Sequence, residues 1–340
     1  MKSNSRQMVL TGLQPTASIQ LGNYLGALQN WARMQNSHDC LFFISDMHAI
    51  TVCGQMDQLR QRSVECIALY IACGIDPEKS CLFVQSQISG HTELAWILGC
   101  LASVGQLERM TQFKDKSRRN GDGFVGMGLL YYPILMAADI LIYNAHAVPI
   151  GEDQRQHLEL ARDLAQRFNG IHGQIFRLPQ PFIGDVCGRV MSLQDPSAKM
   201  SKSDPNPMGT VFLTDSDEEM AKKFRSAVTD CENSVRFSPE KPGISNLLQI
   251  FSGISGISIS LLEERYGSSG YGKFKSDLAD AVIERLSPIR EKYFTLRKER
   301  EYLEKIIENG RQRAQTLANV TLRQVYDLIG FQRCPFFLNT

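Results

Sequence analysis

The chain lacks the features that mark secreted, zinc-binding and membrane-spanning proteins. Its nine cysteines are an odd number and none form a C-x-x-C pair, which argues against a disulfide framework and a cysteine zinc site and indicates a reducing compartment. Residues 1–10 have no apolar core of signal-peptide length. The uncharged run at residues 243–262 is too polar to span a bilayer and predicts a helix, a turn at Gly253 to Gly256 and a second helix. We therefore expect a cytoplasmic protein without a membrane partner.

An excess of charge of one sign is also missing. Lys and Arg total 37 and Asp and Glu total 36, so indiscriminate polyanion binding is disfavoured and any nucleic-acid contact must come from a local patch. Internal repeats and low-complexity segments are absent as well. With 340 residues and 43% hydrophobic content, the chain is long enough for two or three domains with a large core.

The order of the hydrophobic patterns predicts the fold. Before about residue 213, short apolar runs such as "MVLTGL" and "CLFFIS" alternate with amphipathic helices, which is typical of a parallel sheet wrapped by helices. After residue 213 the sequence pattern predicts helices, with N-cap signals such as Thr214 before Asp217. We predict an α/β protein with a Rossmann-like catalytic domain at 1–213, a helical connecting insertion at about 110–176, and an all-α domain at 214–340.

Three loops of this chain have unusual sequences. The first, "TGLQPTASIQLGNYLG" at 11–26, runs from a strand through a turn into a helix near Leu21, whose amides favour an anion, and Gly22 allows close approach of a ring or a ribose. In the second, Glu152 and Asp153 begin a helix, where they stabilise its dipole or accept hydrogen bonds from a ribose. His157, on the same face as Asp153, is either a structural histidine or a site residue.

The third loop, "DPSAKMSKSDPN" at 195–206, concentrates cations. Lys199 and Lys202 lie among serines without regular periodicity, which suits a solvated turn. Flexible ammonium groups also suit an enzyme that meets negative charge as it develops on a polyphosphate. A fourth motif, "GDGFVG" at 121–126, satisfies G-x-G-x-x-G, but "FKDKSRRN" precedes it instead of an apolar strand, so a dinucleotide oxidoreductase is disfavoured.

The first and third loops together resemble the two signatures of class I aminoacyl-tRNA synthetases. The segments "LERMTQFKDKS", "LMAADILIYNAHAVPIGEDQRQH" and "AVTD...KPGISNLL" narrow the resemblance to the bacterial tryptophanyl-tRNA synthetases, over about residues 9 to 330. The resemblance implies a ligase that makes tryptophanyl-adenylate and pyrophosphate from L-tryptophan and Mg-ATP and then charges tRNA(Trp). It also implies a homodimer, a helical domain that reads the anticodon, and Mg²⁺ carried by the ATP phosphates with no metal site of its own.

The same resemblance assigns the site residues by position. Lys199, Lys202, Lys116 and Gln14 would act on the phosphates. The full set facing ATP would be Gln14, Pro15, Thr16, Gly22, Asn23, Gly151, Glu152, Asp153, Val190, Lys199, Met200, Ser201, Lys202 and Ser203.

The tryptophan pocket can also be argued from helical spacing. Four residues at i, i+4, i+7 and i+8 share one helix face that is apolar except for one carboxylate: Tyr132, Met136, Asp139 and Ile140. A structural Asp139 paired with an arginine would fit that pattern. By resemblance, Asp139 accepts the indole N–H, Tyr132 and Gln154 lie near the amino group, and His48 lines the pocket.

The chain departs from the family pattern at three positions. Gln20 replaces the first histidine of the signature's better-known form, Ala17 stands where glycine is usual, and Leu10 where an aromatic residue is common. If residue 17 needs a positive φ, alanine would strain the loop. A tryptophan-sensing or tRNA-binding regulator and a tyrosyl-tRNA synthetase remain as alternative functions. For tRNA, residues 290–313 carry eight cations against five anions, which suits phosphate contacts and a solvated helix face equally.

Overall fold

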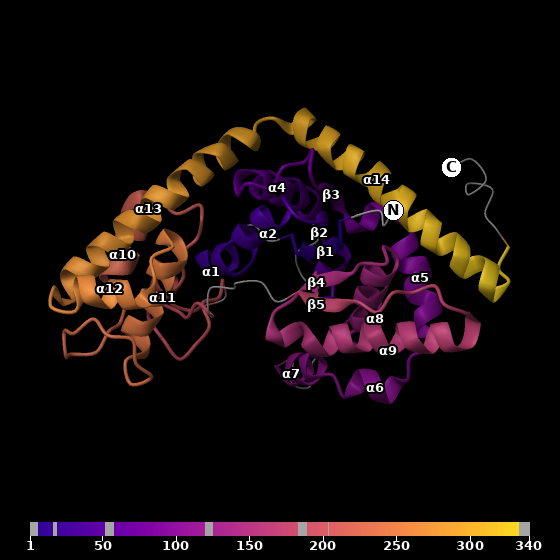
Figure 1. The fold of residues 1–340 in the computed structure, drawn as a ribbon, viewed down its shortest axis with the longest axis horizontal. Coiled ribbons are helices and arrows are strands. Elements are labelled where there is room, and N and C mark those ends of the chain that lie inside the picture. Colours follow the sequence, from indigo (N-terminus) through magenta and orange to yellow (C-terminus); the bar gives the residue numbers. More distant parts are fainter. Residues whose placement is uncertain are drawn as a thin grey trace, which may run out of the picture.

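One parallel sheet forms the centre of the molecule (Figure 1). The computed structural model describes residues 6–15, 19–51, 58–119, 125–182, 189–202 and 204–332. The strand order is β3-β2-β1-β4-β5, and every pair is parallel. The strands are β1 (Met8–Leu13), β2 (Asp39–Ile44), β3 (Cys81–Val84), β4 (Ala147–Pro149) and β5 (Gln180–Phe182). The order reverses between β1 and β4, and ligands bind at such reversals in open α/β sheets.

Helices fill the connections between the strands. They are α1 (Leu21–Asn23), a π-helical stretch (Tyr24–Leu28), α2 (Gln29–Met34), α3 (Asp46–Ala49), α4 (Leu59–Ala72), α5 (Gly90–Gly99), α6 (Val104–Glu108), α7 (Thr111–Arg119), α8 (Met127–Leu141) and α9 (Arg155–His172). Short 3-10 turns lie at Gln85–Gln87, Glu152–Gln154 and Pro207–Gly209. The predicted Rossmann-like fold is confirmed. Helices α5 to α8 lie between β3 and β4, and the stretch 110–176, predicted as a helical insertion, also contains strand β4 of the sheet.

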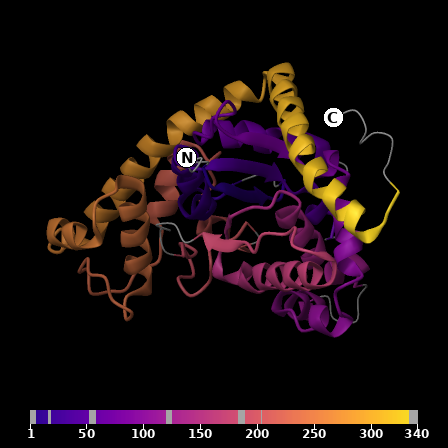
Figure 2. The same ribbon diagram turned by 45° about the vertical axis from the view of Figure 1, so that its right-hand side comes forward.

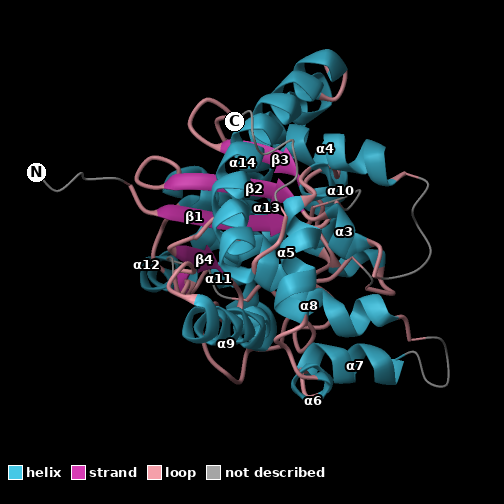
Figure 3. Cartoon of the chain, turned by 90° about the vertical axis from the view of Figure 1, so that its right-hand side faces the viewer, coloured by secondary structure: helices cyan, strands magenta, loops and turns pink. Residues whose placement is uncertain are grey.

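The two faces of the sheet carry separate apolar clusters, because alternate strand residues point to opposite sides. Phe42 and Ile44 of β2 join the cluster that includes residues of α2 and α4. Leu41 and Phe43 join the other cluster, with residues of α5, α8 and α9. Figure 3 shows the strands as one stack enclosed by helices.

After β5, the regular elements of the described chain are helical. They are α10 (Asp217–Arg225), α11 (Pro242–Ser255), α12 (Ile259–Tyr266), α13 (Gly270–Leu296) and α14 (Arg300–Ile329). The two helices predicted at 243–262 are confirmed, but the turn lies at residues 256–258 and not at Gly253 to Gly256, because α11 continues to Ser255 and ends at Gly256 in the left-handed region at φ 75°. No single described helix is long and apolar enough to cross a bilayer; α11 and α12 meet those criteria only as a pair, bent by 113°.

The predicted start of α10 is wrong by two residues. Ser216, not Thr214, is the N-cap: its hydroxyl accepts a hydrogen bond from the backbone of Glu219, and the Glu219 carboxylate accepts one from the Ser216 backbone. A glutamate three residues after Ser216 completes this reciprocal pair, whereas three residues after Thr214 stands Asp217.

Helix α14 returns from the helical region to the sheet and crosses its edge strand β3 (Figure 2). Leu303 and Ile306 belong to one core cluster and Ala318 and Leu322 to the other. Gly310 lies at the crossing, where a methyl group would overlap the backbone carbonyl of Leu82. The glycine therefore allows the helix to cover an edge that would otherwise be open to pairing.

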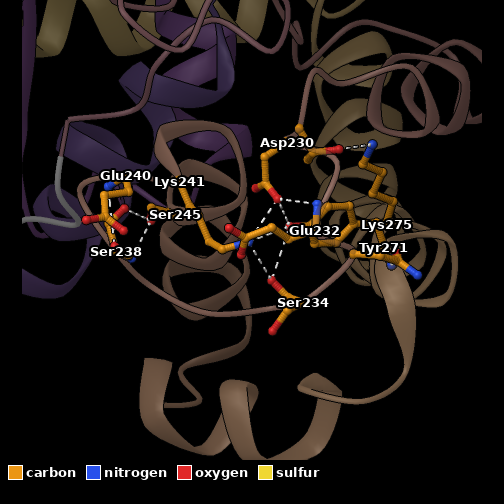
Figure 4. A network of polar contacts seen from close by, with 11 residues as sticks. Asp230, Glu232, Ser234, Ser238, Glu240, Lys241, Ser245, Tyr271 and Lys275 are labelled. Atoms are coloured by element: carbon orange, nitrogen blue, oxygen red, sulfur yellow. Dashed lines mark hydrogen bonds and ion pairs between the residues drawn. The ribbon is translucent and has the colours of Figure 1, made fainter.

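A buried lysine holds the loop before α11 against α13 (Figure 4). The Lys241 ammonium is 2% exposed and lies 2.8 Å from Asp230 Oδ1 and 2.7 Å from Glu232 Oε2. The Tyr271 hydroxyl donates to Asp230 Oδ1 at 2.7 Å and lies 3.1 Å from Lys241 Nζ. These four residues are the Lys241 cluster. The motif "AVTD...KPG" that supported the resemblance thus has a structural role.

Candidate active site

The loop after β1 lies at the strand reversal. Gln14 is exposed, and its amide donates to the backbone carbonyl of His48 at 3.5 Å, while Pro15 is buried. Thr16 and Ala17 lie outside the described residues, so the expected strain at residue 17 is untested. Leu10 is buried in β1 among the side chains of α5, α8 and α9, so this departure from the family pattern is in the core.

The helix that follows this loop packs against the segment before the lysines. A Cβ on Gly22 would lie 3.4 Å from Cβ of Val190, which is ordinary van der Waals contact, so the two residues are direct neighbours. Asn23, also predicted to face ATP, follows in α1 and is half-buried. The first and third predicted loops are therefore brought together here.

The lysine segment, residues 199–202, combines a buried centre with exposed charges. Met200 is 1% exposed, and its N–H donates to the carbonyl of Val190 at 3.1 Å. Lys199 and Lys202 are exposed and form no ion pair with a described residue. Ser201 is half-buried, and Ser203 lies outside the described residues.

The second predicted loop follows β4, directly beside β1 in the sheet. Gly151 and Asp153 are exposed, and the Gln154 amide donates to Asp153 Oδ2 at 2.9 Å. The backbone of Glu152 forms part of the same 3-10 turn, while its side chain is outside the description. The first and second loops therefore begin at the carboxyl ends of the neighbouring strands β1 and β4, where a nucleotide is expected, and the lysine segment contacts the first loop.

Helix α8 presents the predicted pocket face. Tyr132 and Met136 are half-buried, whereas Asp139 and Ile140 are buried. Burial thus increases along the face from Tyr132 towards Asp139, which places the carboxylate at its inner end.

Asp139 is held by three side chains. Its Oδ2 lies 2.8 Å from His48 Nε2 and its Oδ1 lies 2.5 Å from His91 Nδ1, while the Gln85 amide donates to both oxygens at 2.8 Å. Two histidines and an amide therefore take the place of the arginine considered in the structural alternative. Burial alone would raise the pKa of Asp139, but the hydrogen bonds from the two histidines lower it well below its usual range. These contacts favour the ionised form of Asp139, in which both oxygens act as acceptors.

Sequence reasoning missed Gln85, His91 and Tyr143. The last two continue the network, with His91 Nε2 2.8 Å from the Tyr143 hydroxyl. The position of Gln85 could have been used to find it. Gln85 directly follows β3, and the carboxyl end of β3 lies beside the carboxyl end of β2, which is followed by His48. Nothing in the local text marks His91, which lies in a helix that contacts α8.

A second polar group lies at the other end of the α8 face. The Tyr132 hydroxyl is 2.9 Å from His157 Nε2, and Lys116 Nζ of α7 lies 5.2 Å from the centre of the Tyr132 ring. Burial, then Asp153, raises the pKa of Tyr132 to about 12, and burial, then Lys116, lowers that of His157 to about 4. His157 is therefore neutral at pH 7 and positions Tyr132, which favours its structural interpretation.

The alternative dinucleotide motif has the wrong context. The helix α7, not a strand, precedes residues 121–126, and residues 120–124 themselves lie outside the described part of the chain. The Rossmann fingerprint requires a strand that leads into the glycines, so this motif does not mark a nicotinamide site.

Comparisons with known proteins agree with this geometry. The family described as "tRNA synthetases class I (W and Y)" matches residues 2–287. A tryptophan–tRNA ligase of Corynebacterium glutamicum is 49% identical over 325 residues, covering 95% of this chain and 94% of the relative.

Two solved structures are similar over nearly the whole chain. Tryptophanyl-tRNA synthetase of Mycoplasma pneumoniae has a TM-score of 0.87 at 36% identity, covering 96% of this chain and 98% of that one. The Campylobacter jejuni enzyme, complexed with ADP and tryptophan, has a TM-score of 0.81 at 34% identity, covering 96% of this chain and 100% of that one. The chain described here is therefore an enzyme of the class I tRNA synthetase family (W and Y).

Proposed function

We propose that this chain is a tryptophan–tRNA ligase. It activates L-tryptophan with Mg-ATP to tryptophanyl-adenylate and pyrophosphate, then transfers tryptophan to the 3'-terminal adenosine of tRNA(Trp). The observation that carries the proposal is Asp139, an ionised, buried carboxylate at the inner end of a partly apolar helix face. The names of the relatives above support the same substrate.

The pocket residues divide the recognition of tryptophan. Met136 and Ile140 supply apolar contact for the indole ring and Asp139 accepts its N–H, while His48 lines the pocket beside Asp139. Tyr132 and Gln154 lie towards the amino group. Phenylalanine has no N–H to donate to Asp139, and sites built to bond a substrate donor reject an analogue that lacks it by about 10⁴ or more. The pocket therefore selects tryptophan by hydrogen bonding as well as by size.

The three loops divide the recognition of ATP. Gly22 and Asn23 lie against the nucleotide, and Gly151, Glu152 and Asp153 hold the adenosine. Further contacts come from residues of the first and third loops: Pro15, Thr16, Val190, Met200, Ser201 and Ser203. Mg²⁺ enters as part of the substrate, bound by phosphates and water. Among the described residues, no group of three or more His, Cys, Asp or Glu is placed to hold a metal.

Activation is a displacement at phosphorus that needs no covalent enzyme intermediate. A carboxylate oxygen of tryptophan attacks the α-phosphorus, the bond to the bridging oxygen breaks, and pyrophosphate leaves with the electron pair. Positioning and stabilisation of the developing charge supply the catalysis. Lys199 and Lys202 approach the phosphates from the lysine segment, helped by Lys116 and Gln14.

The remaining parts of the proposal concern partners and organisation. Residues 214–340 form the anticodon-binding region, although α14 also completes the core on the sheet. A homodimer is supported by three largely exposed apolar side chains on α5, α6 and α8: Trp96, Val104 and Met127. Sedimentation as a 38.2 kDa monomer at working concentration would contradict the dimer. The described cysteines are free thiols, which fits an enzyme of the reducing cytoplasm.

The test is amino-acid-dependent exchange of pyrophosphate into ATP, with tryptophan and tyrosine compared. Wild type should exchange with tryptophan, and Asp139→Asn should lose about 10²-fold or more in kcat/KM for tryptophan, because an amide replaces the acceptor. Asp163→Asn is the matched control, since Asp163 is exposed on α9 and bonded only to Gln106 among the described residues. Exchange with tyrosine instead, or tryptophan binding without exchange, would refute the proposal.

A further inference from the structure

Gln20 connects the first loop to the lysine segment. It occupies the N-cap position of α1, but its side chain makes no capping hydrogen bond to that helix. Instead, its amide Nε2 donates to the backbone carbonyl of Met200 at 2.8 Å. The two residues are 180 positions apart, so the bond joins two separate parts of the site. Because a carbonyl oxygen only accepts, the amide nitrogen must be the atom that faces it.

Met200 is the centre of the lysine segment, and both of its backbone groups are paired. Its N–H donates to Val190 and its carbonyl accepts from Gln20. On either side, Lys199 and Lys202 are exposed. The segment therefore has a fixed backbone centre, and its two lysine side chains are exposed.

Further hydrogen bonds hold the chain on both sides of the lysine segment. The Ser192 hydroxyl donates to Asp204 Oδ2 at 2.7 Å, and the Thr210 hydroxyl donates to the carbonyl of Ser201 at 2.7 Å. Gly209 lies against this pair, where a methyl group would overlap the Ser192 and Asp204 oxygens. The backbone thus holds the segment in one place, and the contact with Gln20 sets its distance from the first loop.

Gln20 is itself fixed by its backbone. It forms an antiparallel bridge with Phe212, and its two neighbours pair with the same stretch: the Leu21 N–H donates to Val211 at 2.8 Å, and the Leu213 N–H donates to Ile19 at 3.0 Å. The other amide atom, Oε1, is buried and has no partner among the described residues. Burying an unpaired amide oxygen is unfavourable, so the bond to Met200 accounts for the placement of this side chain.

We propose that Gln20 is a positioning residue for adenylate formation: its amide fixes the Met200 peptide, so that Lys199 and Lys202 move about a fixed point when they approach the phosphates. The proposal rests on the proposed function, and it gives a role to a residue that departs from the histidine of the better-known signature. Gln20 acts through Met200 and not by contact with the reacting atoms.

The test compares Gln20→Met, which keeps the length but has no donor, with Gln20→Glu, which turns an acceptor towards the Met200 carbonyl. Gln194→Met is the matched control, because its amide donates at 2.9 Å to the carbonyl of Ser226 and lies five positions before Lys199. Two quantities are measured: amide hydrogen exchange over residues 191–202 in the ligand-free protein, and kcat and KM for both substrates in pyrophosphate exchange. Melting curves show which variants are folded. If only one of the two Gln20 variants folds, that variant alone is enough to test the proposal.

In Gln20→Met, the Met200 amide should exchange its hydrogen about tenfold faster and kcat should fall about tenfold, while the KM for tryptophan changes by less than about twofold. Gln20→Glu should lower kcat further, because the buried Met200 carbonyl then faces a group that repels it. Gln20 variants that match Gln194→Met in kcat would overturn the proposal, whatever their amide exchange. Unchanged amide exchange over 191–202 would also overturn it. A wild-type protein with no tryptophan-dependent pyrophosphate exchange would refute the proposed function. Amide hydrogen exchange would still test the contact between Gln20 and Met200.

Discussion

Two lysine environments in this chain differ in almost every respect. Lys241 is buried, lies between Asp230 and Glu232, and contacts the Tyr271 hydroxyl. Burial alone would lower its pKa, but hydrogen bonds to these three partners raise it above its usual value. Lys199 and Lys202 are exposed and without an ion pair to any described residue, around a backbone that is firmly held. The same ammonium group is immobilised in one place and left free in the other.

Under the proposed function, the difference separates a structural from a catalytic use of charge. A paired, buried cation joins segments of chain but has no capacity left for a ligand. An exposed cation on a four-carbon stem contributes little to stability and can follow charge as it moves from ATP to pyrophosphate. We therefore expect substitutions at the two sites to affect different measurements.

The largest expected effect is on the rate of activation. The double variant Lys199→Ala with Lys202→Ala should lower kcat for pyrophosphate exchange by about 10³ or more, since one such donor is typically worth about 10² to 10³. Its melting temperature should stay within about 1 °C of wild type, because exposed lysines stabilise little. Lys222→Ala, an exposed lysine of α10, is the control and should change neither quantity. A double variant that melts early and remains active would reverse the comparison.

A stability effect is expected at the other lysine. Lys241→Met removes the cation and leaves the Asp230 and Glu232 carboxylates without their partner, so the melting temperature should fall by about 5 to 10 °C. Its exchange rate at 25 °C should remain within about twofold of wild type. Lys273→Met, which breaks an exposed pair with Asp277, should shift melting by less than about 2 °C. Equal melting of both variants would show that the Lys241 cluster adds no stability.

The smallest expected effect is a pH dependence of that stability. Burial would raise the pKa of Asp230, but the hydrogen bonds from Lys241 and Tyr271 lower it to about 2, from an ordinary 3.8. A depressed pKa in the folded state stabilises above the ordinary pKa, and this contribution disappears as the pH falls towards 2. The melting difference between wild type and Asp230→Asn should be constant from pH 7 to 5 and shrink below about pH 4. A melting difference that increased as the pH fell would contradict the lowered pKa of Asp230 in the folded state.

Local signals explain how much of the fold the sequence could predict. Apolar runs with turn residues marked β1 to β3, and the left-handed Gly256 marked the end of α11, because these features depend on residues close in the chain. The site loops were found from their place after strands, and the α8 face from its helical spacing. These predictions depend on periodicity and on sheet topology, both of which the sequence carries directly.

Long-range contacts explain what the sequence could not predict. The partners of Asp139 come from other elements, and His91 has no periodicity that aims it at α8. The crossing of α14 over β3 at Gly310 looks like an unremarkable helical glycine in the sequence. Lys241 and Asp230 were noticed as part of a motif, but only packing shows that they bind one another.

The central claim is tested most directly by measuring two quantities together for the Lys199/Lys202 double variant and Lys241→Met. The quantities are the melting temperature and the tryptophan-dependent rate of ATP–pyrophosphate exchange at 25 °C. The account predicts that the double variant loses only exchange and that Lys241→Met loses only thermal stability. A double variant that exchanges at the wild-type rate, or a folded Lys241→Met protein that does not exchange, would contradict it.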